Sequence, residues 1–253
     1  MKTTIVIYSI SLIATLVMIS MILKLQIRNN KSKKLIEVVS TLNEKDAFFV
    51  SIDKYISEVK SEEFIAKANI VKLWGLIYYK KYDEVISQAK KINFFKILKR
   101  SKNGYSVELN EDSMYYYLLA CPNSLYSENK TDLIKELSDI FSISNEIKDT
   151  LVYKIHTESL KFYLNTEDNG EEFFKEVLEG NYSGYDYSKG LIGLYKNIIT
   201  ALLCAAYARK KDIESIQLIK EDCLTFKKTI IGNRFINELK LNEFLKEEWL
   251  LWS

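Results

Sequence analysis

The chain contains one proline and eight glycines among its 253 residues. Average usage would supply roughly thirty residues of these two types, and folds built from β-sheets need many of them for tight turns. The scarcity excludes collagen-like and Gly/Pro-rich disordered chains, and it argues against sandwiches, barrels and propellers. Hydrophobic residues make up 47% of the chain, a globular value that excludes intrinsic disorder.

The charged residues are unevenly distributed. The formal net charge is +2, yet every charged residue before position 35 is basic. These cations are Lys2, Lys24, Arg28, Lys31, Lys33 and Lys34. Residues 35–253 therefore carry more acidic than basic side chains. Binding of nucleic acid requires clustered cations that neutralise phosphates, so we expect no nucleic-acid partner.

An uncharged, largely apolar segment occupies residues 3–23. As a helix it would measure roughly 31 Å, the thickness of a hydrocarbon core. This length predicts an uncleaved, single-pass transmembrane helix, with the lipid bilayer as the partner of residues 3–23. A cleaved signal peptide is the alternative, but it requires a shorter apolar core and a small-x-small cleavage site.

The cations that follow this segment indicate its orientation. Lys and Arg are enriched on the cytoplasmic side of membrane spans, and most of the N-terminal cations lie between residues 24 and 34. We therefore expect a transmembrane anchor over 1–25, a basic juxtamembrane linker over 26–34 and a cytoplasmic helical-repeat domain over 35–253. The expected location is the cell membrane.

Cysteine and histidine offer little material for metal binding or catalysis. Cys121, Cys204 and Cys223 are odd in number, and their spacings match no zinc or redox motif. Free thiols suit a reducing compartment, and we expect each of them to be a small buried residue. His156 is the only histidine. The sequence therefore predicts no metal and no cofactor.

From residue 35 onward, apolar residues recur with helical spacing. Phe64, Ala68, Val71, Gly75 and Tyr78, for example, fall on one helix face. This periodicity predicts an all-α body whose sequential helices pack antiparallel through short links. The expected helices are 33–42, 44–59, 61–80, 82–97, 111–121, 131–142, 145–165, 170–179, 187–209, 212–226 and 229–250.

Local signals mark the expected ends of these helices. Pro122 is predicted to end the helix over 111–121, because a proline disfavours a helical conformation of the residue before it. Asp212, Thr131 and Ser144 have side chains that are preferred at the N-cap position.

Two stretches resemble the tetratricopeptide repeat, a helix-turn-helix unit of about 34 residues. In the first, Leu73–Ile86, Gly75 occupies the small position and Tyr78 the aromatic position three residues later. In the second, Cys204–Ile216, the distance from Tyr207 to Ile213 equals the six-residue spacing of the family. The resemblance implies an antiparallel helical-hairpin solenoid, and an irregular α-α bundle is the alternative. Both architectures rest on the same physical reason: one helical hairpin cannot bury its apolar face alone, so neighbouring hairpins must pack against it.

The sequence contains no dinucleotide-binding, P-loop, metalloprotease, nucleophile-elbow or calcium-loop motif. We therefore expect a non-enzymatic, membrane-anchored interaction module, an adaptor or scaffold for a protein or peptide partner. The repeat resemblance implies a concave groove lined by first helices. Its candidate partner-binding residues are Asn69, Lys72, Tyr79, Asn197 and Tyr207.

Two other functions stay open at this point. The chain is compatible with a structural subunit of a membrane complex. It is also compatible with a helical enzyme or small-molecule sensor, which would need an enclosed apolar pocket with convergent polar groups. The candidate residues for that role are Tyr115, His156 and Glu158.

Overall fold

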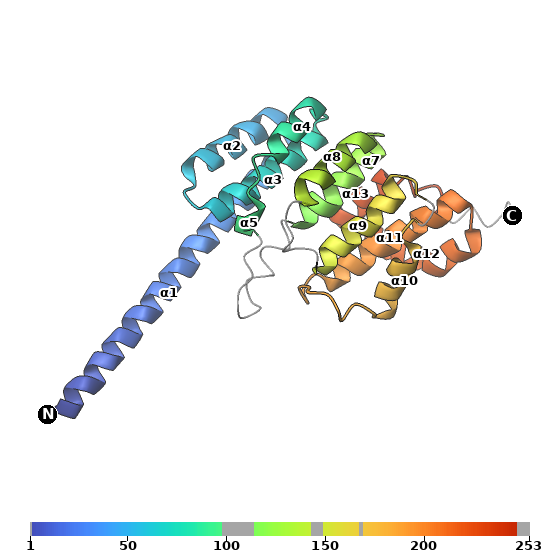
Figure 1. Cartoon of the computed structure of the whole chain (residues 1–253). Helices are drawn as coiled ribbons and strands as arrows, with labels where there is room; N and C mark the ends of the chain where they lie inside the picture. Colours follow the sequence, from blue (N-terminus) through green and yellow to red (C-terminus); the bar gives the residue numbers. More distant parts are fainter. Residues whose placement is uncertain (1, 98–113, 143–148, 167–168, 247–253) are drawn as a thin grey trace. The chain divides into compact units, whose positions relative to one another are not determined.

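The computed structural model describes residues 2–97, 114–142, 149–166 and 169–246. In these ranges the regular elements are helices, without a β-strand, and Thr150 and Asp186 form an isolated bridge (Figure 1). The structure thus confirms the all-α prediction that followed from the scarcity of glycine and proline.

The chain divides into two compact units, Met1–Ala68 and Asn69–Ser253. The first unit contains four elements in whole or in part: α1 (Lys2–Ser40), the 3-10 turn η1 (Thr41–Asn43), α2 (Lys45–Glu58) and the beginning of α3 (Glu62–Tyr78). The boundary falls inside α3, with the buried Phe64 before it and the buried Leu73 after it.

In the first unit, the C-terminal half of α1 is held against α2 and α3. Phe48 and Ile52 of α2 are fully buried, and the Tyr55 hydroxyl donates a hydrogen bond to the carbonyl of Lys31 over 3.1 Å. The Arg28 guanidinium pairs with the Glu63 carboxylate at 3.0 Å. From Arg28 onward, α1 is therefore part of a packed unit.

The N-terminal prediction requires a correction. Helix α1 does not end after the apolar segment but continues through the basic stretch to Ser40, so the expected limits at residues 25 and 34 both lie inside it. The side chains of residues 2–19 lie outside the described part of the structure. Among the residues that the structure describes, no helix is long and apolar enough to cross a membrane. The fold class is corrected to an all-α protein without an assigned transmembrane helix.

The second unit contains the remainder of α3 and the following helices (Figure 1). They are α4 (Tyr82–Ala89), α5 (Phe94–Ile97), the π-turn η2 (Tyr116–Ala120), α7 (Cys121–Ser127), α8 (Thr131–Ser142), α9 (Leu151–Tyr163), α10 (Glu171–Glu179), α11 (Ile192–Lys210), α12 (Ile213–Lys227) and α13 (Ile230–Glu238).

Several of these helices are shorter than the periodicity predicted. The corrected limits are an α4 that ends at Ala89 rather than 97, an α9 that begins at Leu151 rather than 145, an α11 that begins at Ile192 rather than 187, and an α13 that ends at Glu238 rather than 250. Apolar periodicity continues through turns that still bury side chains, so it overestimates helix length. Thr131 is the first residue of α8, and Ser144 lies outside the described residues.

Side-chain caps define three of the helix starts. The Asp212 carboxylate accepts a hydrogen bond from the backbone N–H of Ser215 over 3.1 Å, which confirms the predicted N-cap. Thr150 caps α9 in the same manner, and Thr229 caps α13. Each cap satisfies a backbone donor that the first helical turn leaves without a partner.

Helix α11 forms the centre of the second unit. Every residue from 198 to 207 is buried, and α9, α10, α12 and α13 all contact this helix. A helix that is apolar on all sides must be surrounded by other elements. Cys204 on α11 and Cys223 on α12 are both buried in this core, as is Cys121 on α7, and all three are free thiols.

Pro122 lies inside a helix, so the prediction that it ends one is wrong. The helix runs from residue 114 through η2 and α7 to Ser127. A proline has no N–H to offer the carbonyl of the residue four positions earlier, here Leu118, and its ring crowds that oxygen. The π-turn changes the helical register beside the proline, and His156 Nδ1 lies 2.7 Å from the Leu118 carbonyl oxygen. A histidine on another helix thus replaces the missing donor.

The last described helix returns to an early one. α13 packs against α7, and the Asn123 amide donates a hydrogen bond to Glu238, 115 positions later in the chain. In a regular solenoid each repeat contacts only its neighbours. The second unit therefore has a contact between helices far apart in the chain, as in an irregular α-α bundle. Both stretches that resemble the tetratricopeptide repeat form helix pairs, α3–α4 and α11–α12, but nothing confirms such a repeat, and the resemblance stays a prediction.

Gly232 allows α13 to approach the end of α12. A Cβ atom added at this position would lie 1.9 Å from the Phe226 carbonyl oxygen and 2.5 Å from its carbon. Because these are backbone atoms, a substitution must displace one helix from the other. We expect Gly232→Ala to lower the free energy of unfolding by about 2–3 kcal/mol. Urea denaturation measures the loss; Gly193→Ala, where nothing lies within 4 Å, is the matched control and should be nearly neutral.

Candidate functional site: an apolar groove between α4–α5 and α8

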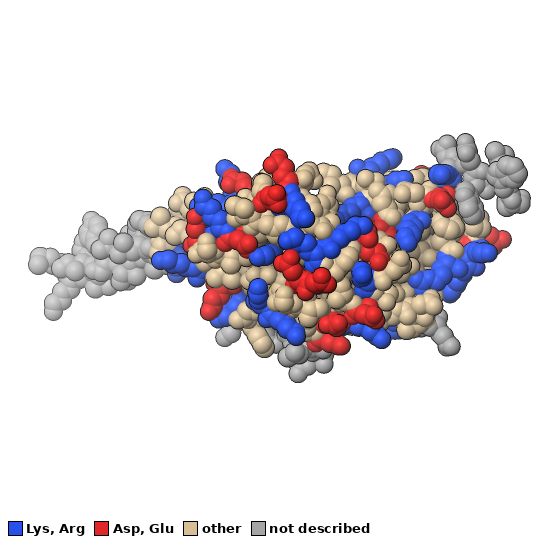
Figure 2. Space-filling view, turned by 90° about the horizontal axis from the view of Figure 1, so that it is seen from above, with Lys and Arg blue, Asp and Glu red and all other residues tan. Residues whose placement is uncertain are grey.

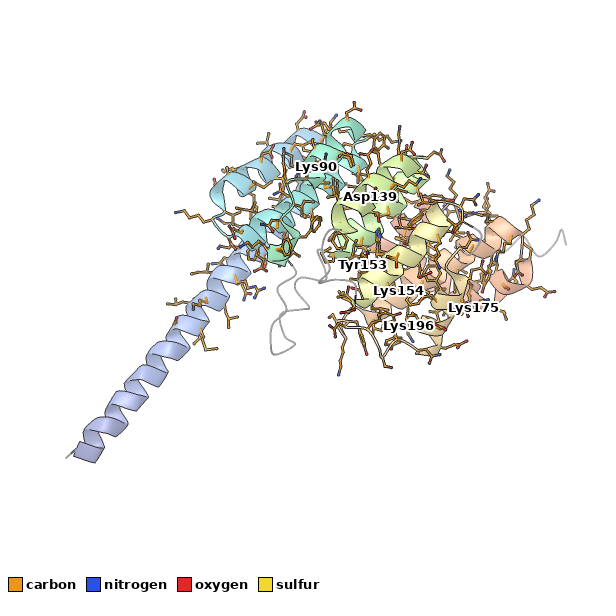
Figure 3. All side chains as sticks on the ribbon, viewed as in Figure 1. Lys90, Asp139, Tyr153, Lys154, Lys175 and Lys196 are labelled. Atoms are coloured by element: carbon orange, nitrogen blue, oxygen red, sulfur yellow. The ribbon has the colours of Figure 1, made fainter. Side chains whose placement is uncertain are left out.

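An apolar groove of about 490 Å³ lies in the second unit, between the α4–α5 segment and the C-terminal end of α8. Its walls include Lys90, Asn93, Phe94 and Phe95 on one side and Ile140 and Phe141 on the other. Figure 3 labels Lys90 at the end of α4 and Asp139 on α8, the helices that border the groove. The volume is within the range of pockets that bury a small ligand or a large side chain.

Aromatic rings form the floor of the groove. Phe94 packs edge-on against Phe141, with ring centroids 4.9 Å apart, and against Tyr117 at the same centroid distance. The Tyr117 hydroxyl donates a hydrogen bond to the Leu137 carbonyl over 2.9 Å, and burial raises the pKa of this tyrosine. The lining rings of Phe94 and Phe141 are thus held by contacts with each other and with Tyr117, which does not itself line the groove.

The rim of the groove combines an exposed ring with basic side chains. Phe95 is 58% exposed, although the neighbouring Phe94 is buried. Lys90 and Lys91 are both exposed, and the segment 90–97 contains three lysines and no acidic residue. Figure 2 shows acidic and basic side chains mixed over the face in view, so a stretch with cations alone is a local feature.

The residues proposed for an enzyme or sensor have separate structural partners. His156 binds the Leu118 carbonyl. The buried Glu158 carboxylate pairs with Lys154 at 2.6 Å and with Lys161 at 2.7 Å. Tyr115 is also buried, and burial raises its pKa above the ordinary value. Among the described residues, no group of three His, Cys, Asp or Glu side chains has the arrangement of a metal site.

Two of the predicted partner-binding residues are buried. The Asn69 carbonyl oxygen Oδ1 accepts a hydrogen bond from Gln88 Nε2 over 2.9 Å, which joins α3 to α4. Tyr207 is 7% exposed, and the Lys175 ammonium lies 5.6 Å from the centre of its ring. The structure gives both side chains a packing role.

The other three predicted residues lie at or near the surface. Lys72 and Tyr79 are half-buried, and Asn197 is exposed. Lys72 belongs to α3 and Tyr79 follows its end, whereas Asn197 belongs to α11. None of the five predicted residues lines the apolar groove, so their role in partner binding stays a prediction.

Tyr79 lies at the edge of a cluster of aromatic rings around an arginine. The Arg234 guanidinium stacks over the rings of Trp74, at 4.7 Å, and Tyr78, at 5.1 Å. Tyr78 contacts Tyr79 edge-on at 4.9 Å, and Trp74 contacts Tyr116 at 5.3 Å. Cation–π stacking of this kind orders the arginine and leaves Tyr78 40% exposed.

A hydrogen-bonded network, here called the polar latch, joins α7, α9 and α13. Glu238 Oε1 accepts hydrogen bonds from Ser124 Oγ over 2.7 Å and from Arg234 Nε over 2.8 Å. Glu238 Oε2 accepts from Asn123 Nδ2 over 2.7 Å, and the Tyr163 hydroxyl donates to Asn123 Oδ1 over 3.2 Å. The latch fixes the closing helix by satisfying polar groups on all three elements.

The groove residues were not among the predicted site residues. Phe94 and Phe95 fall inside the expected helix 82–97, where they read as one more apolar turn. A signal was present nevertheless: Lys90 and Lys91 interrupt the apolar pattern before these two phenylalanines. The opposing wall, Phe141, comes from a segment more than forty positions later, and sequence spacing does not reveal that contact.

The comparisons add no relationship. No protein-family model matches the chain, and neither a curated protein nor a solved structure does.

Proposed function

We propose that this protein is a protein–protein interaction module whose apolar groove binds a peptide segment of a partner. The observation that carries the proposal is Phe95: a large ring that is 58% exposed beside a preformed aromatic floor. Exposed aromatic surface next to a rigid apolar pocket is typical of sites that accept an anchor side chain.

The chemistry of the groove favours binding over catalysis. Of its wall residues, Lys90 is the only one with an ionisable side chain, and a general acid–base or nucleophilic mechanism needs a second, positioned group. The floor residues are held by ring contacts and a satisfied tyrosine hydroxyl. Such a surface can recognise a partner by its shape and by one charge.

The rim indicates what the partner segment carries. The groove of about 490 Å³ has room for a large apolar side chain, and a carboxylate next to that side chain complements Lys90 and Lys91. The partner class is therefore an acidic peptide segment with one or two bulky apolar residues. Charge complementarity of this kind raises the association rate and selects among partners.

Selection from a random peptide library displayed on phage, with the full-length protein as bait, tests the proposal. We expect enriched peptides to combine an acidic residue with a bulky apolar one. Phe95→Ala should weaken their affinity about tenfold, because truncation of an anchor costs more than 1 kcal/mol. Lys90→Gln with Lys91→Gln should weaken binding less, and mainly at low salt. Fluorescence anisotropy of a labelled peptide measures both effects.

Leu218→Ala is the matched control, because Leu218 on α12 is 85% exposed and outside the groove. It should leave peptide affinity unchanged. Peptides without a shared pattern, or equal binding to the Phe95→Ala and Leu218→Ala variants, would contradict the proposal. Whether the module works at a membrane, as an adaptor or as a structural subunit, stays a prediction; fractionation of cells for the full-length protein measures its location.

A further inference from the structure

Two turns of α1 are not covered by any other part of the chain that the structure describes. Every residue from Ser20 to Ile27 is exposed, although five of them are large and apolar. These five, here called the apolar belt, are Met21, Ile22, Leu23, Leu25 and Ile27, and each is more than half exposed. Leaving such side chains in water is unfavourable by roughly 1.5–3 kcal/mol for each one compared with full burial.

The belt surrounds the helix instead of forming one stripe. Successive residues of an α-helix are rotated by about 100°, so Met21, Ile22 and Leu23 point in three different directions. A partner helix buries a single stripe at spacings of three and four residues. Three consecutive apolar residues therefore favour an occupant that reaches the helix from several sides, as lipid chains do.

Basic side chains flank the belt. Lys24 lies within it, Lys33 and Lys34 follow it, and all three are exposed. The first acidic residue of the chain is Glu37. Juxtamembrane lysines of this kind are attracted to anionic headgroups, whereas they would repel their counterparts in a second copy of the chain.

We infer that the apolar belt and the lysines Lys24, Lys33 and Lys34 dock on an anionic phospholipid leaflet. From Met21 to Ile27 the helix rises about 9 Å, which is comparable with the roughly 5–10 Å to which interfacial helices insert into the boundary between headgroups and acyl chains. Arg28, which pairs with Glu63, marks where α1 begins to pack against other helices and leaves the lipid. This lipid surface is independent of the proposed peptide groove.

A fluorescent probe at the belt tests the contact in the full-length chain. Ile27→Cys is labelled with an environment-sensitive dye; the native cysteines are buried in the folded protein. Vesicles of an equal mixture of phosphatidylcholine and phosphatidylglycerol should shift the emission to the blue. Val50→Cys is the matched control, since Val50 is 68% exposed on α2, and its label should not respond. An unchanged emission at position 27 would overturn the inference.

Charge substitution tests the preference for anionic lipid. The triple variant Lys24→Gln, Lys33→Gln and Lys34→Gln should lower partitioning onto the anionic vesicles by at least about tenfold, with little change on pure phosphatidylcholine. Equal effects on both vesicles would overturn the charge assignment. The matched control is the triple variant Lys60→Gln, Lys189→Gln and Lys228→Gln, three exposed lysines elsewhere.

A second copy of the chain is the competing occupant. If a second copy covers the belt, the emission of the label at position 27 should shift with protein concentration before vesicles are added. Sedimentation velocity should then detect a dimer. That result would refute the lipid inference. Peptide binding by the Phe95 groove would be unaffected in either case, so the two proposals fail separately.

Discussion

Replacing Glu238 with alanine is expected to lower the free energy of unfolding by about 2–3 kcal/mol, because removal of one partner from a partly buried ionic network leaves other members unsatisfied. Its two oxygens accept hydrogen bonds from Asn123, Ser124 and Arg234. Without the carboxylate, Arg234 Nε loses its acceptor, and the Asn123 amide keeps only the Phe235 carbonyl at 3.5 Å. Chemical denaturation of the full-length protein, monitored by circular dichroism, measures the loss.

The conservative variant separates charge from shape in the polar latch. Glu238→Gln keeps one acceptor oxygen but turns an amide N–H₂ toward the Asn123 amide or Arg234, so its effect should fall between those of the native residue and alanine. Glu221→Ala, at an exposed position of α12, should change stability by less than about 0.5 kcal/mol. A Glu238→Ala variant as stable as the Glu221→Ala variant would show that α13 is not held by the latch.

The stability of the protein is expected to rise by about 3 kcal/mol between pH 4 and pH 6.5 through His156 alone. Burial lowers the pKa of His156 to about 4, against a smaller opposing effect of its hydrogen bond to Leu118. In this pH window the unfolded chain binds a proton at His156 that the folded chain does not bind. Stability therefore increases with pH through the window and reaches a plateau above about pH 6.5.

The tautomer of His156 follows from its partners. The Leu118 carbonyl only accepts hydrogen bonds, so Nδ1 carries the proton. Nε2 is then an acceptor for the Ser138 hydroxyl, 3.4 Å away. Protonation of Nε2 would place a charge in a buried site without an acidic partner among these contacts, which explains the direction of the shift.

His156 is the only histidine of the chain, so its ring protons identify it directly in an NMR titration. We expect a midpoint near pH 4 in the folded protein. His156→Asn keeps a donor for Leu118 but does not titrate, and it should lose the slope between pH 5 and pH 6.5 while staying more stable than His156→Ala. A midpoint at the ordinary histidine value, or an unchanged slope in His156→Asn, would contradict the buried neutral state.

The prediction of helix ends succeeded where the signal was local. Asp212 caps α12 as expected, because the carboxylate and the backbone N–H of Ser215 that it binds are three residues apart. The turn at Asn169 and Gly170 is equally local, since both residues adopt left-handed backbone conformations there. Such signals depend only on neighbours in the chain, so sequence reasoning can evaluate them.

Prediction failed where a distant residue changed the local rule. Pro122 has every local property of a helix terminator, but the helix continues through the π-turn, and His156 lies 2.7 Å from the Leu118 carbonyl that a proline cannot serve. The donor comes from α9, and the sequence around Pro122 does not indicate it. The buried role of Asn69 was missed for the same reason, since its partner Gln88 lies on the next helix.

The sequence by itself determined that this chain is built from helices, because turn-forming residues are scarce and apolar residues recur with helical spacing. It also determined where α12 begins, since capping by Asp212 depends only on adjacent residues. Only the tertiary structure decided that α13 closes onto α7 and that Phe94 meets Phe141 to form a groove. Those contacts join residues far apart in the chain, and their energy comes from packing and satisfied hydrogen bonds that exist only when the helices are assembled.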